Sequence, residues 1–272
     1  MQSGSMPELN YNIELDWQER ALHYGDGLFE TLLKSNHEIP LWRKHIDRLR
    51  RGCERLSIPA PATNWLAERV AEESRDLENA IIKIIVSRGR GGRGLQLPAS
   101  PRASVFVLCY PWSAPSQQHH SVSICKTRLP INPNLAGLKH LNRLDYVLAA
   151  LELEKMPAVT EGIICDTEGF VIEGLISNLF FINQSCLYTP SLDFAGVDGI
   201  MRQLVIEQAD KINLRVEQGR YTSQELLESA ECFLCNSVRG ITPIVAIDQQ
   251  QFMPGDYTGA LMAALNPPAA IV

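Results

Sequence analysis

A polar stretch broken by two prolines, Pro111-Trp-Ser-Ala-Pro-Ser-Gln-Gln-His-His120, lies near the middle of the chain and limits what it can fold into. Prolines spaced this closely interrupt helices and central strands, so the stretch is typical of a linker. Strand-like and helix-like segments occur on both sides of it, and the predicted fold class is α+β. The 272 residues are enough for two compact units. The sequence therefore predicts an N-terminal α+β domain over 1–113 and a C-terminal domain over 114–272.

Apolar periodicity predicts the elements on each side of this linker. Ahead of it we expect strands over 27–34, 80–86 and 103–109, helices over 43–57 and 63–76, and the start of a further strand at Leu41-Trp42. After it we expect strands over 121–126, 231–235 and 243–247, a β-rich block over 162–189, and helices over 140–155, 199–212 and 257–265. One more helix should begin at Thr222, because Thr222-x-x-Glu225 is a capping box.

Composition and charge argue against several classes of protein. The chain has 25 Lys and Arg against 31 Asp and Glu, a net charge of −6 that is unlike a protein coating nucleic acid. Its apolar runs fall short of the roughly 20 residues of a membrane span, and residues 1–13 lack the features of a signal peptide. Seven scattered cysteines do not resemble a secreted disulfide framework. We therefore expect a cytoplasmic protein that binds neither nucleic acid nor membrane.

Two short motifs match known binding patterns, but the residues around them do not fit those patterns. Gly89-Arg-Gly-Gly-Arg-Gly94 matches the dinucleotide-binding pattern, but Leu95-Gln-Leu-Pro-Ala-Ser-Pro101 cannot open the helix that this pattern requires. Cys232 and Cys235 lie in an expected strand, where residues three apart point to opposite faces, and no second ligand pair accompanies them. No metal site is expected. The glycine loop and its arginines are either a solvated hairpin loop or a basic rim that grips an anionic substrate.

Lysine is scarce, with seven residues in the chain, and Lys139 has the most suggestive surroundings. Apolar residues and a glycine precede it and an expected helix follows, so its amine would be partly removed from water. Desolvation lowers the pKa of a lysine amine and prepares it for Schiff-base chemistry. By composition alone, however, most lysines are simply exposed. Lys83 is the rival candidate, although its strand setting offers no obvious set of partners.

A buried carboxylate and a phosphate-type site complete the pattern. Glu173 lies in an apolar strand region, where it either faces solvent or meets a positive partner that offsets its burial. A protonated pyridine nitrogen would be such a partner, because pyridoxal phosphate acts as an electron sink when a carboxylate holds that nitrogen. Arg48 and the helix start at Gly199-Ile-Met-Arg202 would suit its phosphate. Together these residues favour pyridoxal 5'-phosphate as the cofactor.

Several blocks of the sequence resemble the fold-type IV pyridoxal-phosphate enzymes, the group containing branched-chain and D-amino-acid aminotransferases. These blocks are Tyr24-Gly-Asp-Gly-Leu-Phe-Glu-Thr31, His45-Ile-Asp-Arg-Leu49, Ser87-Arg-Gly89, Glu173 with Ser177-Asn178-Leu179, Gly199-Ile-Met-Arg202 and Ile241-Thr-Pro243. Within the family, three segments of the chain resemble the aminodeoxychorismate lyases in particular. They are Leu135-Ala-Gly-Leu-Lys-His-Leu-Asn-Arg-Leu144, the loop 87–94 and Ala195-Gly-Val-x-Gly-Ile-Met-Arg202. The resemblance spans about residues 16 to 250. It implies a D-amino-acid aminotransferase-like fold, with a smaller N-terminal α/β domain and a larger, β-barrel-like C-terminal α/β domain, and a homodimer.

The resemblance also implies roles for individual residues. Lys139 would carry the cofactor as an internal aldimine, and Thr31 would be a second catalytic residue. Glu173 would bind the pyridine nitrogen, and Asn178 would also contact the cofactor. Four residues are implied for the phosphate: Arg48, Ile200, Met201 and Ser237. The residues implied for the substrate are Arg93, Arg88 and Tyr24.

The chemistry implied is a lyase reaction. Lys139 would take the C4 proton of 4-amino-4-deoxychorismate as general base, the enolpyruvyl ether would leave, and the ring would become aromatic. The products would be 4-aminobenzoate and pyruvate, in folate biosynthesis. The alternative within the same fold is a D-amino-acid or branched-chain aminotransferase, which needs a keto acid for its second half-reaction. A non-enzymatic protein that kept the fold is the third reading.

Overall fold

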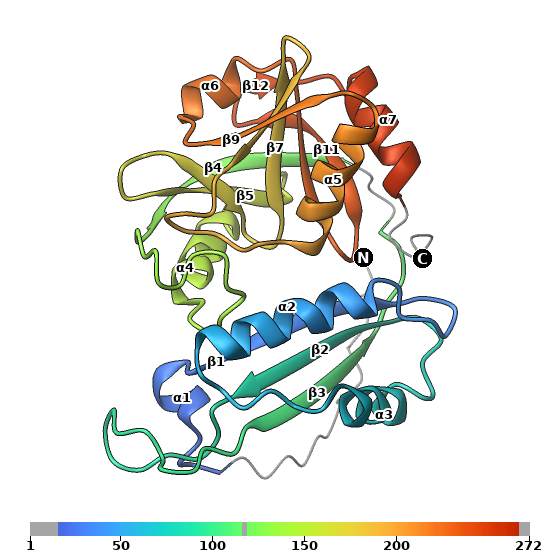
Figure 1. Ribbon diagram of the computed structural model, residues 1–272. Coiled ribbons are helices and arrows are strands. Elements are labelled where there is room, and N and C mark those ends of the chain that lie inside the picture. Colours follow the sequence, from blue (N-terminus) through green and yellow to red (C-terminus); the bar gives the residue numbers. More distant parts are fainter. Residues whose placement is uncertain (1–15, 116–118, 267–272) are drawn as a thin grey trace.

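A computed structural model describes residues 16–115 and 119–266 of the chain. Its elements form two separate β-sheets, a three-stranded sheet in the lower half of Figure 1 and a nine-stranded sheet in the upper half. The last strand of the small sheet ends at Pro111, the first residue of the proline-broken stretch, and the first strand of the large sheet begins at His120, its last residue. The predicted α+β class is therefore confirmed. The predicted boundary between 113 and 114 falls between the two sheets and stays a prediction.

The small sheet is antiparallel, in the order β1 (Gly27–Lys34), β2 (Ala80–Ser87) and β3 (Ser104–Pro111). Two helices, α2 (Trp42–Arg55) and α3 (Thr63–Glu73), pack on it, and the short α1 (Arg20–Tyr24) precedes it. The apolar stripe of α2 was foreseen from its spacing of three and four, and Ile46, Leu49 and Cys53 are buried against β1. The opposite side of α2 is rich in arginine, and this contrast with the apolar stripe makes the helix easy to predict from the sequence.

The large sheet closes on itself. Six strands form a ring in the order β7, β10, β11, β4, β5 and β6, because β7 pairs with both β6 and β10. Their bounds are β4 (His120–Leu129), β5 (Glu161–Asp166), β6 (Val171–Gly174), β7 (Asn178–Asn183), β10 (Glu231–Asn236) and β11 (Gly240–Ile247). Strands β8 (Cys186–Pro190) and β9 (Arg215–Gly219) extend the sheet from β7, and β12 (Gln250–Gln251) extends it from β11. The predicted barrel-like C-terminal unit is confirmed.

Helices α4 (Leu144–Leu153), α5 (Ile200–Lys211), α6 (Ser223–Leu227) and α7 (Asp256–Leu265) accompany this barrel. Helices α5 and α7 pack against one another and on the barrel, where Phe180 and Phe233 stack with ring centroids 5.1 Å apart. The predicted capping box at Thr222 is present at the start of α6. Cys232 and Cys235 lie in different apolar clusters, as expected for opposite faces of one strand.

One predicted element is wrong and three were not foreseen. Leu41-Trp42 does not begin a strand, because Leu41 takes up a left-handed backbone conformation (φ 62°) and Trp42 is the first residue of α2. The helix expected over 140–155 begins only at Leu144. Elements α1, β9 and β12 were missed because they are short and polar, without a measurable apolar period.

A short segment over 137–141, here called the lysine segment, joins the two sheets. On one side Phe29 donates its amide hydrogen to the carbonyl of Lys139 (2.9 Å), and Leu141 donates to Gly27 (3.0 Å). On the other side Gly137 donates to the carbonyl of Gly196 (2.9 Å) and accepts from Asp198 (3.0 Å). The lysine segment thus behaves as an extra strand along the edge of β1 while its other edge is tied to the loop before α5.

Candidate active site

A cavity of about 540 Å³ opens beside the lysine segment, between the small sheet and the barrel. Residues from β1, α2, α4, β6, β7, α5 and β10 contribute to its wall. Eight of the residues singled out in the sequence line it: Thr31, Arg48, Lys139, Glu173, Asn178, Ile200, Met201 and Ser237. They come from positions up to 206 residues apart, and the fold brings them to one place.

Lys139 is the basic group at the centre of this cavity. Its Nζ lies 4.4 Å from the centroid of the Phe29 ring and makes no hydrogen bond or ion pair with the described part of the chain. Burial, followed by the positive charges of Arg48 and Arg143, lowers the pKa of Lys139 from 10.5 to about 7. The expected desolvation is confirmed. The rival Lys83 also lies over Phe29, at 5.2 Å, but it does not line the cavity.

Glu173, on β6, is 4% exposed and faces the same cavity. Its Oε1 accepts a hydrogen bond from the hydroxyl of Tyr146 (2.5 Å), and its Oε2 accepts from the amide of Val197 (2.9 Å) and from Asn178 Nδ2 (3.2 Å). All three donors are neutral. Burial raises the pKa of Glu173, although Arg143 and these donors act in the opposite direction. A carboxyl group in this state is suited to receive a cationic N–H.

Arg48, on α2, is held from two sides. Its Nε and Nη2 bind both carboxylate oxygens of Glu30 (2.8 and 2.5 Å), and its Nη1 donates to the carbonyl of Asp198 (2.9 Å). His45 Nδ1 lies 2.7 Å from the same carboxylate. The charge of Arg48 and the hydrogen bonds from His45 and Arg48 outweigh burial and lower the pKa of Glu30 to about 2. This network fixes the guanidinium next to the start of α5.

The N-terminus of α5 borders the cavity through Gly199, Ile200 and Met201. No side chain caps this helix, so the amide groups of its first turn are available to an anion. A Cβ at Gly199 would lie 1.9 Å from Asn178 Oδ1, so any other residue here would displace the Asn178 side chain. Across the cavity Ser237 donates its hydroxyl to the carbonyl of Thr31 (3.2 Å), which joins a β10–β11 turn to β1.

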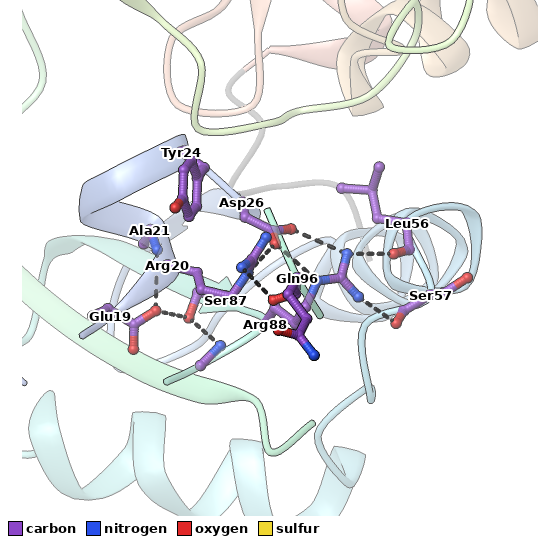
Figure 2. A network of polar contacts seen from close by, with 12 residues as sticks. Glu19, Arg20, Ala21, Tyr24, Asp26, Leu56, Ser57, Ser87, Arg88 and Gln96 are labelled. Atoms are coloured by element: carbon purple, nitrogen blue, oxygen red, sulfur yellow. Dashed lines mark hydrogen bonds and ion pairs between the residues drawn. The ribbon is translucent and has the colours of Figure 1, made fainter. Parts of the chain in front are cut away.

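Arg88, Arg93 and Tyr24 do not line this cavity. The Arg88 guanidinium is buried against Asp26 (2.8 and 3.1 Å) and the carbonyls of Leu56 and Ser57 (both 2.8 Å), as Figure 2 shows. The hydroxyl of Tyr24 donates to the carbonyl of Gly94 (2.7 Å) and so ties α1 to the glycine loop.

Arg20 completes this second network. It shares Asp26 with Arg88 and also donates to the carbonyl of Gln96 (3.3 Å) (Figure 2). Arg93 itself is exposed on the glycine loop. Two anchored arginines and Tyr24 therefore hold the base of the loop, while its tip with Arg93 projects into solvent.

Phe29, Arg143 and Tyr146 also line the cavity, and the sequence predicted no role for them, although Phe29 and Arg143 lie in blocks that carry the family resemblance. Arg143 packs over Tyr146, with its Cζ 4.5 Å from the ring centroid, and lies 5.5 Å from the centroid of Phe29. Arg143 is the N-cap residue of α4, and Tyr146 lies three positions later in the first turn of the helix. That spacing was available in the sequence, but the apolar residues that surround Tyr146 on α4 concealed it.

The described residues contain no group of three or more His, Cys, Asp or Glu side chains placed to hold a metal ion. None of the helices in residues 16–115 and 119–266 has the length and apolar character needed to cross a bilayer.

Comparison with known proteins places the chain in a family. The model of the family "Amino-transferase class IV" matches residues 27–247. The aminodeoxychorismate lyase of Vibrio harveyi is 31% identical over 256 residues, covering 91% of this chain and 94% of the relative. The crystal structure of 4-amino-4-deoxychorismate lyase from Pseudomonas aeruginosa is 37% identical and superposes with a TM-score of 0.87, covering 93% and 94% of the two chains.

An aminotransferase is also among the relatives. The branched-chain-amino-acid aminotransferase of Escherichia coli K12 is 25% identical over 249 residues, covering 86% of this chain and 80% of the relative. The lyases and the aminotransferase share one fold, and enzymes of this family use pyridoxal phosphate. On these matches, the chain belongs to the class IV aminotransferase family.

Proposed function

We propose that this protein is a pyridoxal-phosphate-dependent lyase that converts 4-amino-4-deoxychorismate to 4-aminobenzoate and pyruvate. The observation that carries the proposal is the cavity in which a low-pKa lysine, a buried carboxyl group and an arginine beside a helix N-terminus meet. The similarity to lyases from two organisms, both above 30% identity, favours this activity over transamination.

The residues present fit the cofactor. Glu173 has only neutral hydrogen-bond donors, which suits a protonated ring nitrogen as its missing cation. The uncapped N-terminus of α5 with Ile200 and Met201, together with Arg48 and Ser237, suits a phosphate dianion. Lys139 lies on the same wall with no counter-ion and would be the covalent attachment point. Asn178 would position Glu173 through the 3.2 Å contact.

Bound in this cavity, the cofactor supplies an electron sink for the carbon that carries the substrate amine. The Lys139 amine, with its pKa near 7, is then a suitable base for the C4 proton. Breaking the C4–H bond and then the C3–O bond releases enolpyruvate, which becomes pyruvate, and leaves an aromatic ring. The conjugate acid of Lys139 retains the proton for the enolpyruvate carbon or for solvent. Thr31, beside Ser237 on the cavity wall, is our candidate for a second catalytic group.

The substrate is a dicarboxylate and needs cationic partners. Arg88 is fully engaged by Asp26 and two carbonyls, so Arg93 is the better candidate of the two loop arginines. Arg93 and Tyr24 do not line the cavity of their own chain. Their proposed substrate contacts therefore require the glycine loop to reach the cavity of a second copy.

A homodimer is part of this proposal, and α4 supports it. Four apolar side chains follow one side of this helix with spacings of three and four and are about half or more exposed: Leu144, Val147, Leu148 and Leu151. Val147 and the exposed Ile176 also line the cavity, so a second copy on this face would cover the cavity mouth. Light scattering should give twice the chain mass, and Leu151→Glu should lower it. Met253→Glu, at an exposed site beyond β12, should not.

We further propose a cytoplasmic location. Six cysteines are buried free thiols, the state that a reducing compartment maintains: Cys53, Cys125, Cys165, Cys186, Cys232 and Cys235.

The decisive experiment starts with the visible absorbance of the purified protein before and after borohydride, followed by mapping of the labelled lysine. Label at Lys139, and its loss in Lys139→Ala but not in Lys83→Ala, is expected. Lys83 is a matched control because it lies over the same aromatic ring outside the cavity. The absence of a visible absorbance band would contradict the proposal and favour the alternative of a non-enzymatic protein that kept the fold.

A second assay separates the lyase from the aminotransferase. Formation of 4-aminobenzoate from 4-amino-4-deoxychorismate without any keto acid is expected. Strict dependence on a keto-acid acceptor would instead establish the aminotransferase alternative, for which the Escherichia coli relative is the model.

A further inference from the structure

Tyr146 occupies a position that the proposed chemistry has not yet used. It stands one turn into α4, with its hydroxyl 2.5 Å from Glu173 Oε1, and it lines the cavity. The other oxygen of Glu173 is held by Val197 and Asn178, which are fixed by the loop before α5 and by β7. Among the described residues, Tyr146 is therefore the one hydrogen-bond donor to Glu173 that lies outside both the barrel strands and the loop before α5.

Arg143, the N-cap residue of α4, packs over the ring of Tyr146. Its Nε donates to the carbonyl of His140 (3.0 Å), which orients the guanidinium, and its Cζ lies 4.5 Å from the centre of the Tyr146 ring. Its buried Nη2 has no hydrogen-bond partner in the described residues. The tyrosine ring thus lies between a cation that has donors to spare and a carboxylate that has no cation in contact.

We propose that Tyr146 is a positioning residue that keeps Glu173 ionised and aimed at the ring nitrogen of the cofactor. This inference rests on the proposed function. A hydroxyl donor stabilises the carboxylate form, whereas burial favours the neutral acid. With the donor removed, the proton shared by Glu173 and the ring nitrogen would move toward Glu173. The ring would then lose its positive charge and with it much of its ability to accept electrons.

Other charged groups near Glu173 set the background for this effect. They are Lys139, Arg143, Glu161 and Arg202. Tyr146 itself does not titrate in the working range, because burial and the neighbouring Glu173 raise the pKa of its hydroxyl well above 10. It therefore remains a donor at every pH at which the enzyme would be assayed.

The test uses the holoenzyme reconstituted with cofactor labelled with ¹⁵N in the ring. Tyr146→Phe keeps the aromatic ring under Arg143 and removes only the hydroxyl. The ¹⁵N resonance should move toward that of neutral pyridine, and the pH midpoint of the visible absorbance should shift. A hydrogen bond to a charged group is worth roughly 10- to 100-fold, so kcat should fall by about that factor while KM changes little.

Two variants sharpen this test. Tyr221→Phe is the matched control, because it removes a hydroxyl that donates to the carbonyl of Glu217 outside the cavity, and it should leave the ¹⁵N resonance unchanged. Tyr146→Gln restores a donor without the ring and should recover part of the signal. In Glu173→Gln, adding Tyr146→Phe should produce no further change, because the tyrosine acts through the carboxylate.

An unchanged ¹⁵N resonance and pH profile in Tyr146→Phe would overturn the inference, even with a reduced rate. The proposed function fails by a different result, namely wild-type protein that holds no borohydride-reducible cofactor on Lys139. If Tyr146→Phe does not fold, Tyr146→Gln is compared with Tyr146→Leu. A ¹⁵N resonance nearer to the wild-type value in the glutamine variant than in the leucine variant supports the donor role, and equal values contradict it.

Discussion

Two buried glutamates, Glu173 in the cavity wall and Glu30 behind Arg48, differ in how their charge is balanced. Glu30 on β1 is 1% exposed and is held by Arg48 and His45, with its pKa lowered to about 2. Glu173 on β6 is 4% exposed, has three neutral donors, and has its pKa raised. The two carboxyl groups are almost equally buried, but their pKa values are shifted in opposite directions.

The difference separates a structural carboxylate from one prepared for a ligand. A buried charge is tolerated when it is paired, and Glu30 has its pairing within the chain. Glu173 has hydrogen bonds but no cation, so the protein leaves its charge to be balanced by whatever enters the cavity. Burial alone would not have distinguished them, and the identity of the partners does.

The largest effect is expected from breaking the Glu30 network. Glu30→Gln leaves the buried Arg48 without its counter-charge, and loss of one member of a buried pair typically removes about 3–5 kcal/mol of unfolding free energy. Urea unfolding of the cofactor-free protein measures this. Glu72→Gln is the control, because its pair with Arg69 is largely exposed and should contribute no more than about 1 kcal/mol. Equal effects in the two variants would contradict a structural role for Glu30.

Glu173→Gln should behave in the opposite way. The cofactor-free protein should unfold at the same urea concentration or a higher one, because the variant removes a buried carboxyl group that has no counter-ion. Turnover with cofactor should fall by about 10²- to 10³-fold, the usual loss when one preorganised electrostatic partner is removed. A large loss of stability without cofactor would place Glu173 in the same structural class as Glu30.

The pH dependence of stability should also have opposite signs at the two sites. The pKa of Glu30 is depressed when folded, so its contribution is present above about 4.5 and is lost as pH falls toward 2. The pKa of Glu173 is raised, so folding becomes less favourable as pH rises above about 4.5. Unfolding curves between pH 3 and 7 for the wild type and both glutamine variants measure these slopes. Slopes of the same sign would contradict the comparison.

The last pH effect concerns Lys139, the cation whose charge is influenced by both carboxylates. Its folded pKa of about 7 lies below 10.5, so above pH 7 the unfolded chain binds the extra proton and stability should rise with pH. The slope is at most about 1.4 kcal/mol per pH unit. Subtracting the curve of cofactor-free Lys139→Met from that of the wild type between pH 7 and 9 isolates this term. A flat difference would mean that the amine is not desolvated.

The local surroundings of single residues could be predicted from their neighbours along the chain. Lys139 and Glu173 stand in apolar surroundings, and both pKa directions follow from that. The stripe of α2 follows from its period, and the closed barrel was expected from resemblance. These features are local, or are carried by motifs that can be read along the chain.

Partnerships between distant elements could not be predicted in this way. Arg88 is a candidate for substrate binding because its loop is basic and the expected substrate is a dicarboxylate, and in the structure it binds Asp26, 62 positions earlier. The hydroxyl of Tyr146 meets Glu173 because a helix packs beside a strand, which no local spacing encodes. Hydrogen-bond partners of buried polar groups depend on tertiary packing, and that information is absent from periodicity.

The lysine segment gives the proposed active site a mechanical property. Its main chain is bonded on one edge to β1 and on the other to the loop before α5, so the two sheets cannot rotate apart without rupturing the pairs at Phe29, Leu141 and Gly137. Domain opening on the slow timescale of hydrogen exchange should therefore expose these three amides together. A ligand that bridges Arg48 and the start of α5 should slow their exchange in concert, even though none of the three would donate to it.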